Sequence, residues 1–278
     1  MLSQSVLSGL FLGGMYGLIG LGLGLSWGLL GQINLTHFGF VFLSAYLCYH
    51  LTMVWGVDPL LTLGLLVPAF FAVGVVMQWA LARFRVSTFN SLLVTFGLTV
   101  MIEALIQKIW TADFRKLQTG YGEEKFSFLG LYAPLPELLT LTVSAAAAGG
   151  IWLLMRYTDL GKAMRAMAED APIAAAFGVN ARALALLLSG SCVALAAIAG
   201  VFFALSFTLT PTQIFSWVGV VFAAVMMGGL GNPLGPLLAG LVIGVSEALA
   251  MAVFSPSWAP IVSFSLLIVL LLFRPAHR

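Results

Sequence analysis

Charged side chains are scarce in this sequence. They make up 8% of its 278 residues, whereas hydrophobic residues make up 61% and the mean hydropathy is +1.08. Soluble domains carry about 25% charged residues, so the composition excludes an ordinary soluble protein. Apolar runs of about 18 to 20 residues recur along the chain, and each is long enough to cross a hydrocarbon core as an α-helix. The runs do not alternate in polarity, which excludes an outer-membrane barrel.

Residues that hold metals or phosphates are also sparse. The only cysteines, Cys48 and Cys192, lie far apart in apolar surroundings, so we expect no disulfide framework, no metal site and no cofactor. The net charge of +2 and the scattered basic residues argue against nucleic-acid binding. A GxxxxGK[ST] phosphate loop is missing, because the stretch at Gly161 lacks the upstream glycine and the following hydroxyl. Any ATP hydrolysis must therefore occur in another chain.

The apolar runs predict an all-α, polytopic helical bundle that forms a single transmembrane domain over residues 1–278. We expect about eight or nine spans, because two glycine-rich segments leave the count open by one. The first run is too long for a secretory signal core, and the first positive charge is Arg83, so we expect it to be a retained span. The predicted spans are 6–30, 37–52, 60–81, 89–107, 138–155, 183–207, 215–229, 235–252 and 259–273.

The distribution of Lys and Arg predicts the orientation. Loops on one side of the predicted spans hold eight basic residues and loops on the other side hold four, and the richer side is expected in the cytoplasm. The C-terminus is then cytoplasmic and, with nine spans, the N-terminus is outside. The connection 108–137 becomes an extracytoplasmic loop that could form a small cap or a docking surface. The connection 156–182 becomes a cytoplasmic loop.

The cytoplasmic loop has the signals of two short helices. Thr158 or Asp159 can cap the first helix, Asp170 can cap the second with Pro172 at an early helical position, and Gly178 is placed to end it. Ile173 and Phe177 are four residues apart, so they share a face of the second helix. Two apolar side chains on a short helix suit a groove on a partner protein, but they also suit a helix lying on the lipid surface.

Several segments resemble the permease subunits of branched-chain amino-acid ABC importers of the H type. The cytoplasmic run RYTDLGKAMRAMAEDAPIAAAFGVNARALALLLSGSCVALAAIAGV is similar to a family signature. Near the N-terminus GQINLTHFGFVFLSAY resembles an Asn-x-Ala-His-Gly element, and LLVTFGLTVMIEAL resembles the fourth-span segment. VMMGGLGNPLGPLLAGLVIGVSEAL resembles a Gly-Gly-Leu-Gly region near the C-terminus, where LLLFRP follows. The resemblance covers nearly the whole chain in the family order.

The resemblance implies a permease without catalytic activity in a bacterial-type cytoplasmic (inner) membrane. Its implied partners are cytoplasmic ABC ATPase subunits, a second permease subunit in a homo- or heterodimer, an extracytoplasmic substrate-binding protein and membrane lipid. The segment around Glu169 to Gly178 would be the coupling helix that fits a cleft on the ATPase. The residues assigned to ATPase coupling are Arg165, Glu169, Asp170, Pro172, Ile173, Phe177 and Gly178.

Two glycine-rich interruptions, near 31–39 and 228–235, predict discontinuous helices. Paired breaks in the two halves of a chain are typical of substrate paths built on inverted repeats. The alternative is ordinary packing of small residues between helices, which we favour for Gly20, Gly22 and Gly24. Including a polar window in the fourth span and one buried acid, the residues predicted to line a translocation path are Asn34, Thr36, His37, Gly39, Thr95, Gly97, Gly229, Gly231, Asn232 and Glu247.

Some of these residues have a structural alternative. Asn34 or Thr36 can cap the helix that follows the first break, and His37 can be a satisfied structural histidine rather than a substrate contact. Thr95 can bond to a carbonyl of its own helix. At this break the chain departs from its relatives, with Thr36 for their alanine, Phe38 for their glycine, and Gly39 one residue late.

The acids inside the spans are few, and this bears on the transport mechanism. We expect Glu103 to be locally paired or to reach the surface, whereas Glu247 lies deeper and is the better functional candidate. Proton-coupled carriers use relays of paired acids and bases, which these spans lack. The alternatives to a branched-chain amino-acid permease are a urea or short-amide importer permease, an ion-coupled secondary carrier, and a membrane scaffold without transport.

Overall fold

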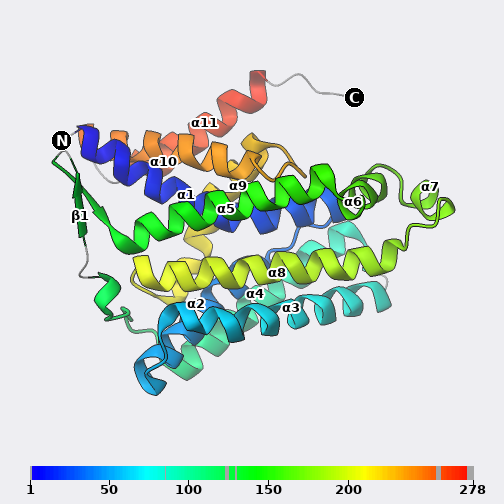
Figure 1. Ribbon diagram of the computed structural model, residues 1–278, viewed down its shortest axis with the longest axis horizontal. Helices are drawn as coiled ribbons and strands as arrows, with labels where there is room; N and C mark the ends of the chain where they lie inside the picture. The colour runs from blue at the N-terminus through cyan, green and yellow to red at the C-terminus, as the bar shows by residue number, and fades with distance from the viewer. Residues whose placement is uncertain (1, 85, 123–124, 129, 255–257, 274–278) are drawn as a thin grey trace.

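The computed structural model describes residues 2–84, 86–122, 125–128, 130–254 and 258–273. The described chain is a bundle of long helices, as the sequence predicts (Figure 1). The long helices are α1 (Leu2–Leu30), α2 (Thr36–Trp55), α3 (Pro59–Arg83), α4 (Thr88–Trp110), α5 (Leu135–Tyr157), α8 (Ala181–Ser206), α9 (Ile214–Gly228), α10 (Gly235–Val253) and α11 (Ala259–Phe273). Two short helices, α6 (Asp159–Glu169) and α7 (Ala171–Ala176), lie in the predicted cytoplasmic loop.

Eight helices in the described part of the chain are long and apolar enough to cross a membrane. The ninth apolar run forms α11, which is helical over only 15 residues. The structure therefore agrees with a prediction of about eight or nine spans. Local capping explains several of the boundaries. Asp58 caps α3 by accepting a hydrogen bond from the N–H of Leu60 at 2.8 Å, and Gly56 ends α2 in the left-handed conformation with φ of 69°.

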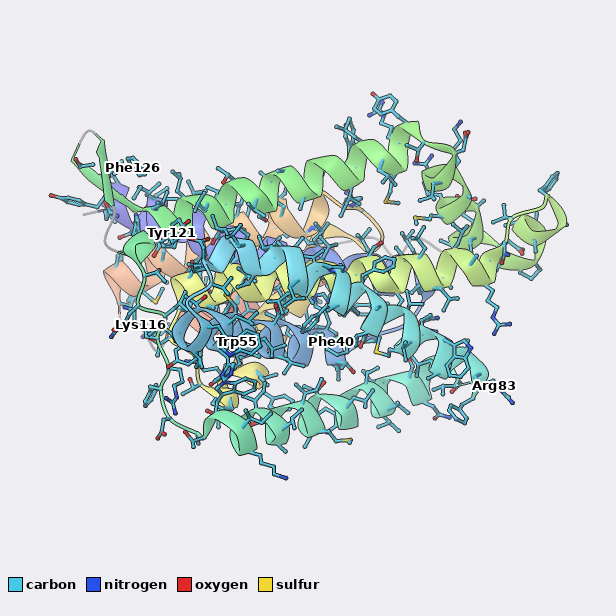
Figure 2. All side chains as sticks on the ribbon, turned by 60° about the horizontal axis from the view of Figure 1, so that its bottom comes forward. Phe40, Trp55, Arg83, Lys116, Tyr121 and Phe126 are labelled. Atoms are coloured by element: carbon cyan, nitrogen blue, oxygen red, sulfur yellow. The ribbon has the colours of Figure 1, made fainter. Side chains whose placement is uncertain are left out.

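The two ends of the bundle differ in their loops and charges. α6 and α7 project from one end, and the start of α1 lies at the other beside a small hairpin (Figure 1). Figure 2 shows Arg83 at the α7 end, whereas Lys116, Tyr121 and Phe126 lie at the hairpin end. Arg83 of the first predicted basic group and Lys116 of the second thus lie at opposite ends of the bundle. Arg85, Arg274 and Arg278 of the first group, and with the last two the predicted cytoplasmic C-terminus, lie outside the described residues.

The connection 108–137 is more ordered than the sequence indicates. It contains a 3-10 turn, η1 (Gly120–Gly122), and an antiparallel pair of strands, β1 (Lys125–Phe128) and β2 (Leu131–Pro134). The side-chain amide of Gln4 on α1 bonds both the N–H and the C=O of Tyr132 at 2.9 Å. The hairpin is therefore tied to the first turn of α1.

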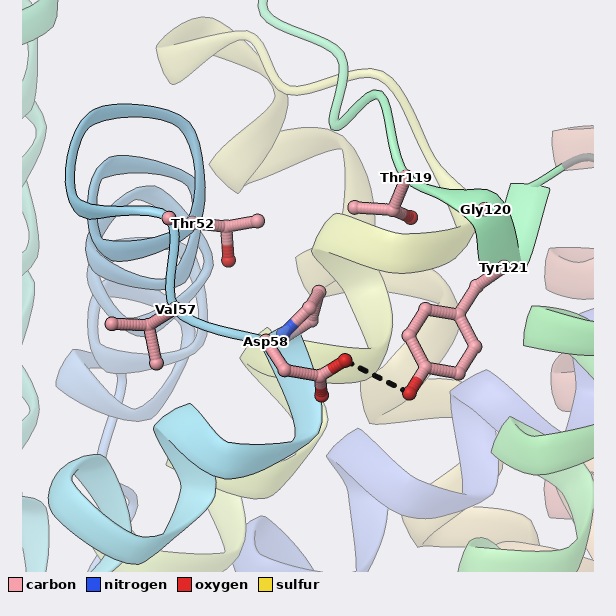
Figure 3. A pocket seen from close by; sticks show the side chains of 8 residues that line it. Thr52, Val57, Asp58, Thr119, Gly120 and Tyr121 are labelled. Carbon is pink, nitrogen blue, oxygen red and sulfur yellow. Dashed lines mark hydrogen bonds between the residues drawn. The ribbon is translucent and has the colours of Figure 1, made fainter.

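A second attachment holds this connection to the turn between α2 and α3. The hydroxyl of Tyr121 donates to the carboxylate of Asp58 at 3.0 Å, across a pocket of about 590 Å³ (Figure 3). Arg115 and Leu209 also exchange backbone hydrogen bonds of 3.0 and 2.7 Å. These contacts fix the connection as a cap over one end of the bundle.

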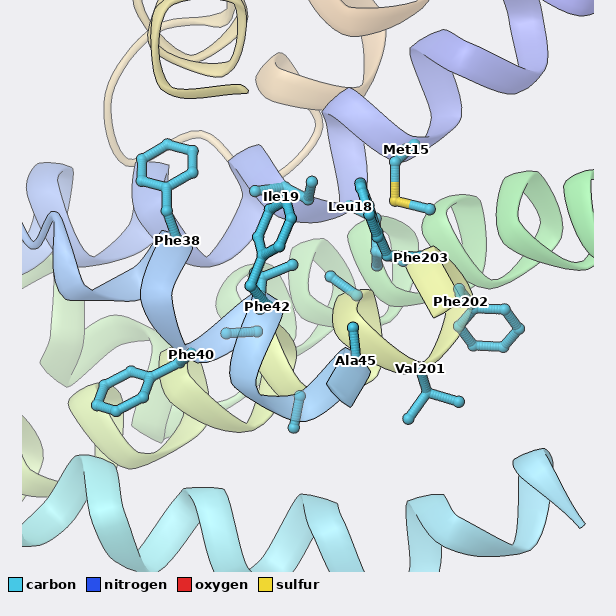
Figure 4. Packing of buried hydrophobic residues seen from close by; sticks show 14 of the residues in the cluster. Met15, Leu18, Ile19, Phe38, Phe40, Phe42, Ala45, Val201, Phe202 and Phe203 are labelled. Atoms are coloured by element: carbon cyan, nitrogen blue, oxygen red, sulfur yellow. The ribbon is translucent and has the colours of Figure 1, made fainter. Parts of the chain in front are cut away.

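The core lies where α1, α2 and α8 meet. Phe42 of α2 packs on Phe203 of α8 with their ring centroids 4.8 Å apart, and Met15 and Leu18 of α1 complete the contact (Figure 4). On its other side α1 packs closely on α10, where any side chain at Gly13 would overlap the backbone at Gly240. Glycine at such a crossing lets two helix backbones approach, which is how helices associate where water supplies no driving force.

Candidate translocation path and coupling helix

The first break spans residues 31–35, between α1 and α2. Gly31 begins it with φ of 65°, a left-handed conformation that glycine adopts without strain. The break is shorter than the predicted 31–39, because Thr36, His37 and Gly39 already belong to α2. The interruption is a tight turn between two nearly continuous spans.

The cap of α2 comes from another helix, which corrects the expectation that Asn34 or Thr36 supplies it. The hydroxyl of Thr95 on α4 accepts a hydrogen bond from the N–H of Leu35 at 3.1 Å. The hydroxyl of Thr36 instead donates to the carbonyl oxygen of Thr95 at 3.0 Å. The hydroxyl of Thr95 also lies 3.2 Å from the carbonyl oxygen of Leu92 on its own helix, which is the structural role that the sequence allows for this residue.

Asn34 lies inside the turn with an incomplete set of partners. Its side chain is 6% exposed, its amide nitrogen lies 4.0 Å from the sulfur of Met77, and its Oδ1 has no hydrogen-bond partner among the described residues. Thr36 and Met77 line a groove of about 630 Å³ between α2, α3 and α4 whose other walls are apolar. An apolar groove is therefore lined by Thr36, the residue that directly follows the first break.

His37 and Phe38 follow Thr36 in α2, and both are packed inside the bundle. Nε2 of His37 lies 2.9 Å from the carbonyl oxygen of Ile19, and Gly22 of α1 leaves room for the imidazole. His37 thus has the backbone partner of a structural histidine. Phe38 is 1% exposed and stacks on Phe222 of α9 at 6.2 Å, so the side chain that replaces glycine fills the space between α2 and α9.

The second break, residues 229–234 between α9 and α10, packs against the end of α1. Gly229 and Gly231 have φ of 88° and 77°. The N–H of Gly231 donates to the carbonyl of Gly24 at 3.2 Å, and a Cβ at Gly28 would overlap the backbone of Gly231. Asn232 is exposed, and its side chain accepts a hydrogen bond from the N–H of Leu234 at 3.2 Å. The last turns of α1 therefore contact the second break, and the end of α1 leads directly into the first break.

The two acids that the sequence places inside the spans have different surroundings. Glu247 of α10 is 2% exposed and accepts hydrogen bonds from Tyr16 of α1, at 2.8 Å, and from Ser263 of α11. It joins three helices. Glu103 accepts a hydrogen bond from Gln107, one turn along α4, at 3.2 Å, which is the local pairing that the sequence predicts.

The predicted path residues therefore form separate groups. Thr36 and Thr95 meet beside Asn34 at the first break, whereas Gly231 meets α1 at the second. Gly97 is exposed on α4, with open space beside it. Of the ten residues, Thr36 lines the apolar groove between α2, α3 and α4. The sequence did not single out Tyr16 or Phe222, which have no local signal because their partners are distant in the chain.

The predicted cytoplasmic loop folds as its caps indicate. Thr158 caps α6 by accepting from the N–H of Gly161 at 3.1 Å, and Asp170 caps α7 by accepting from the N–H of Ile173 at 2.9 Å. Gly178 follows α7 with φ of 88°. Arg165 donates to the carbonyl oxygen of Met155 at 2.6 Å, which fastens α6 to the last turn of α5.

The short helix α7 presents its apolar side chains outward. Ile173 is 57% exposed and Phe177, the residue that ends α7, is 86% exposed, while Ala174 is buried. Glu169, Asp170 and Pro172 are exposed beside them. α7 stands beyond the ends of α5 and α8 (Figure 1). An exposed phenylalanine on a projecting helix is a feature of docking surfaces.

Comparison with known proteins identifies the family. The family model described as "Branched-chain amino acid transport system / permease component" matches residues 5–271. The chain belongs to this family. It is accordingly a multi-pass membrane protein of the permease type, as the resemblance in the sequence implied.

Similar proteins match along nearly their whole length. The high-affinity branched-chain amino acid transport system permease protein BraD of Pseudomonas aeruginosa is 26% identical over 98% of this chain and 94% of its own. The corresponding proteins named LivH of Salmonella typhimurium and Escherichia coli K12 are each 27% identical over 98% of this chain and 93% of their own. No solved structure matches the chain significantly.

Proposed function

We propose that this chain is the membrane-spanning subunit of an ATP-binding cassette importer for branched-chain or other apolar amino acids. A binding protein outside the membrane delivers the substrate, and ATP hydrolysis occurs in separate ATPase subunits. Family membership over residues 5–271 supports this assignment, as do the names of relatives that cover nearly the whole chain. The substrate class rests on those relatives, so a urea or short-amide importer is the alternative within the same mechanism.

The observation that carries the mechanism is the geometry of α7. Ile173 and Phe177 are exposed at 57% and 86% on a capped helix that projects beyond the bundle. A helix of this length has little stability of its own. Its capping residue and the attachment of α6 to α5 stabilise α7 in a position where a partner can bind it. We assign α7 as the coupling helix that enters a cleft of the ATPase, with Arg165 holding α6 against α5.

The charge distribution supports an orientation with α7 in the cytoplasm. Lys162 and Arg165 lie in α6, Arg156 and Arg182 lie at the adjoining ends of α5 and α8, and Arg83 lies at the same end of the bundle (Figure 2). By the positive-inside tendency this end is cytoplasmic and the hairpin end faces outward. The start of α1 is then outside, the C-terminus is cytoplasmic, and the membrane is a bacterial-type inner membrane.

We place the translocation path where this subunit meets a second permease subunit. Asn34 and Thr36 at the first break are buried and Gly231 at the second packs on α1, so these residues do not line an open path within one chain in this conformation. Closure of the two ATPases would move α7, and α6 would pass the movement to α5, because Arg165 and Met155 join them at 2.6 Å. The breaks supply the turns about which the helices can shift.

Association with the ATPase tests this proposal. Ile173→Ser and Phe177→Ser together should reduce co-purification of the ATPase about tenfold or more, because buried apolar anchors dominate such interfaces. Phe126→Ser is the matched control, since Phe126 is 54% exposed at the hairpin end. Unchanged co-purification in the double variant would exclude α7 as the coupling helix.

A further inference from the structure

A small cavity lies at the hairpin end of the bundle, between α1, α5 and α8. Its volume is about 150 Å³, which suits a single small solute. The polar residues Ser8, Glu137, Thr140 and Ser206 line it together with the apolar Phe11 and Met15. Ser8 is exposed and Met15 is fully buried, so the cavity runs from the surface into the bundle. We call this cavity the outer subsite.

The carboxylate of Glu137 is the one charged group in the outer subsite. It makes no hydrogen bond or ion pair with any described residue, in contrast to Glu103 and Glu247. It stands in the first turn of α5, where the helix dipole favours a negative charge. A half-buried carboxylate without a partner is a site for a cation that donates hydrogen bonds, such as an ammonium group.

Hydroxyl groups continue from this carboxylate along the same face of α5. Glu137, Thr140 and Ser144 are spaced i, i+3 and i+7, which places them in one line on a helix. Thr140 is 2% exposed, and its hydroxyl lies 3.3 Å from that of Ser206 on α8. Ser144 is 1% exposed, and its hydroxyl has no hydrogen-bond partner among the described residues. Ser144 lies one turn below the cavity and does not line it, so the polar line on α5 extends inward from the outer subsite.

We propose that the outer subsite receives a zwitterionic amino acid with an apolar side chain. Glu137 binds the ammonium group, the hydroxyls of Ser8 and Ser206 donate to the carboxylate, and Phe11 and Met15 contact the side chain. The hydroxyl of Thr140 already donates to the carbonyl of Pro136 at 2.8 Å, so it lines the subsite without donating to the ligand. The role rests on the proposed function, because in the proposed orientation the hairpin end of the bundle, where the subsite lies, faces the binding protein that delivers the substrate. It also selects among substrates, since urea and short amides carry no ammonium group.

Thiol labelling of the full chain in membrane vesicles tests this subsite without any need for transport. A reporter cysteine replaces Leu12, or Phe207 in a second variant, because both residues line the cavity and neither bonds the ligand, while the native Cys48 and Cys192 are 0% and 1% exposed. L-Leucine should slow labelling by a water-soluble methanethiosulfonate about fivefold at roughly four times its dissociation constant. 4-Methylvalerate has the same carbon chain without the ammonium group. The same protection should therefore require a concentration of 4-methylvalerate about tenfold higher than that of leucine.

The substitution Glu137→Gln should raise the leucine concentration for half-protection about tenfold, because it removes the charge-assisted hydrogen bond. Glu103→Gln is the matched control and should leave that concentration unchanged, since Glu103 bonds Gln107 and lies outside the cavity. Three results overturn the inference: no labelling at either reporter, no protection by leucine, or protection by leucine that Glu137→Gln does not weaken. Equal protection by urea or acetamide would contradict the zwitterion. Loss of the ATPase partnership would instead contradict the proposed function.

Discussion

The hydroxyl of Thr95 on α4 caps α2 through the N–H of Leu35, although the two residues are 60 positions apart in the chain. A helix that starts inside a membrane leaves N–H groups that no water reaches, so each of them needs a partner from the protein. Here α4 supplies that partner, and it also accepts the hydroxyl of Thr36. The first break and α4 therefore form one structural unit.

The variant Thr95→Val tests this unit, because valine keeps the shape of threonine and removes its hydroxyl. The N–H of Leu35 would lose its partner, and we expect the free energy of unfolding in detergent to fall by about 1–2 kcal/mol. Thr142→Val is the control, since the hydroxyl of Thr142 is exposed and bonds only the carbonyl of Leu139 in its own helix. Equal stability of the two variants would show that the cap contributes nothing.

The contact between Gly28 and the second break gives another prediction. A methyl group at Gly28 would overlap the backbone of Gly231, which no rotation of a side chain can relieve. Gly28→Ala should therefore lower the free energy of unfolding by about 1–3 kcal/mol. The control is Gly64→Ala in the second turn of α3, where no atom outside the helix's own backbone lies within 4 Å of the added methyl. That variant should be neutral or slightly stabilising.

The residues of the two breaks should differ in access to water. Asn232 is exposed, so Asn232→Cys should react readily with a water-soluble thiol reagent. Asn34 is 6% exposed, so Asn34→Cys should react slowly at rest. If Asn34 lines the path, its labelling should rise when the complete importer is trapped with ATP or with substrate. Slow labelling of Asn34→Cys in every state would remove it from the path.

The sequence predicts the features that depend on neighbouring residues. The spans follow from apolar runs, and the caps of α6 and α7 at Thr158 and Asp170 follow from side chains within three positions of their N–H partners. The cap of α2 was assigned to the wrong residue, because Thr95 is distant in sequence and close only after folding. The same reason hides the bond between Tyr16 and Glu247 and the cavity that joins Glu137 to Ser206.

Phe38 is a residue that the sequence marks as unusual without explaining it. The resemblance to the permease family expects glycine at this position, where two backbones would approach closely. In the structure the close contacts lie at neighbouring glycines. Gly22 of α1 leaves room for His37, and Gly39 of α2 faces Ile102 of α4. Phe38 itself packs on Phe222. Sequence patterns identified the anomaly, but only the packing of α1, α4 and α9 explains it.

ATP-dependent uptake is the most direct test of the central claim that this chain carries an apolar amino acid under the control of an ATPase docked on α7. Proteoliposomes would contain the chain with its partner permease and ATPase subunits, and the loaded binding protein would be added outside. We predict leucine uptake that requires ATP and that the Ile173→Ser, Phe177→Ser double variant loses, while Phe126→Ser retains it. Uptake by this chain alone, driven by an ion gradient and indifferent to ATP and to changes in α7, would contradict the account.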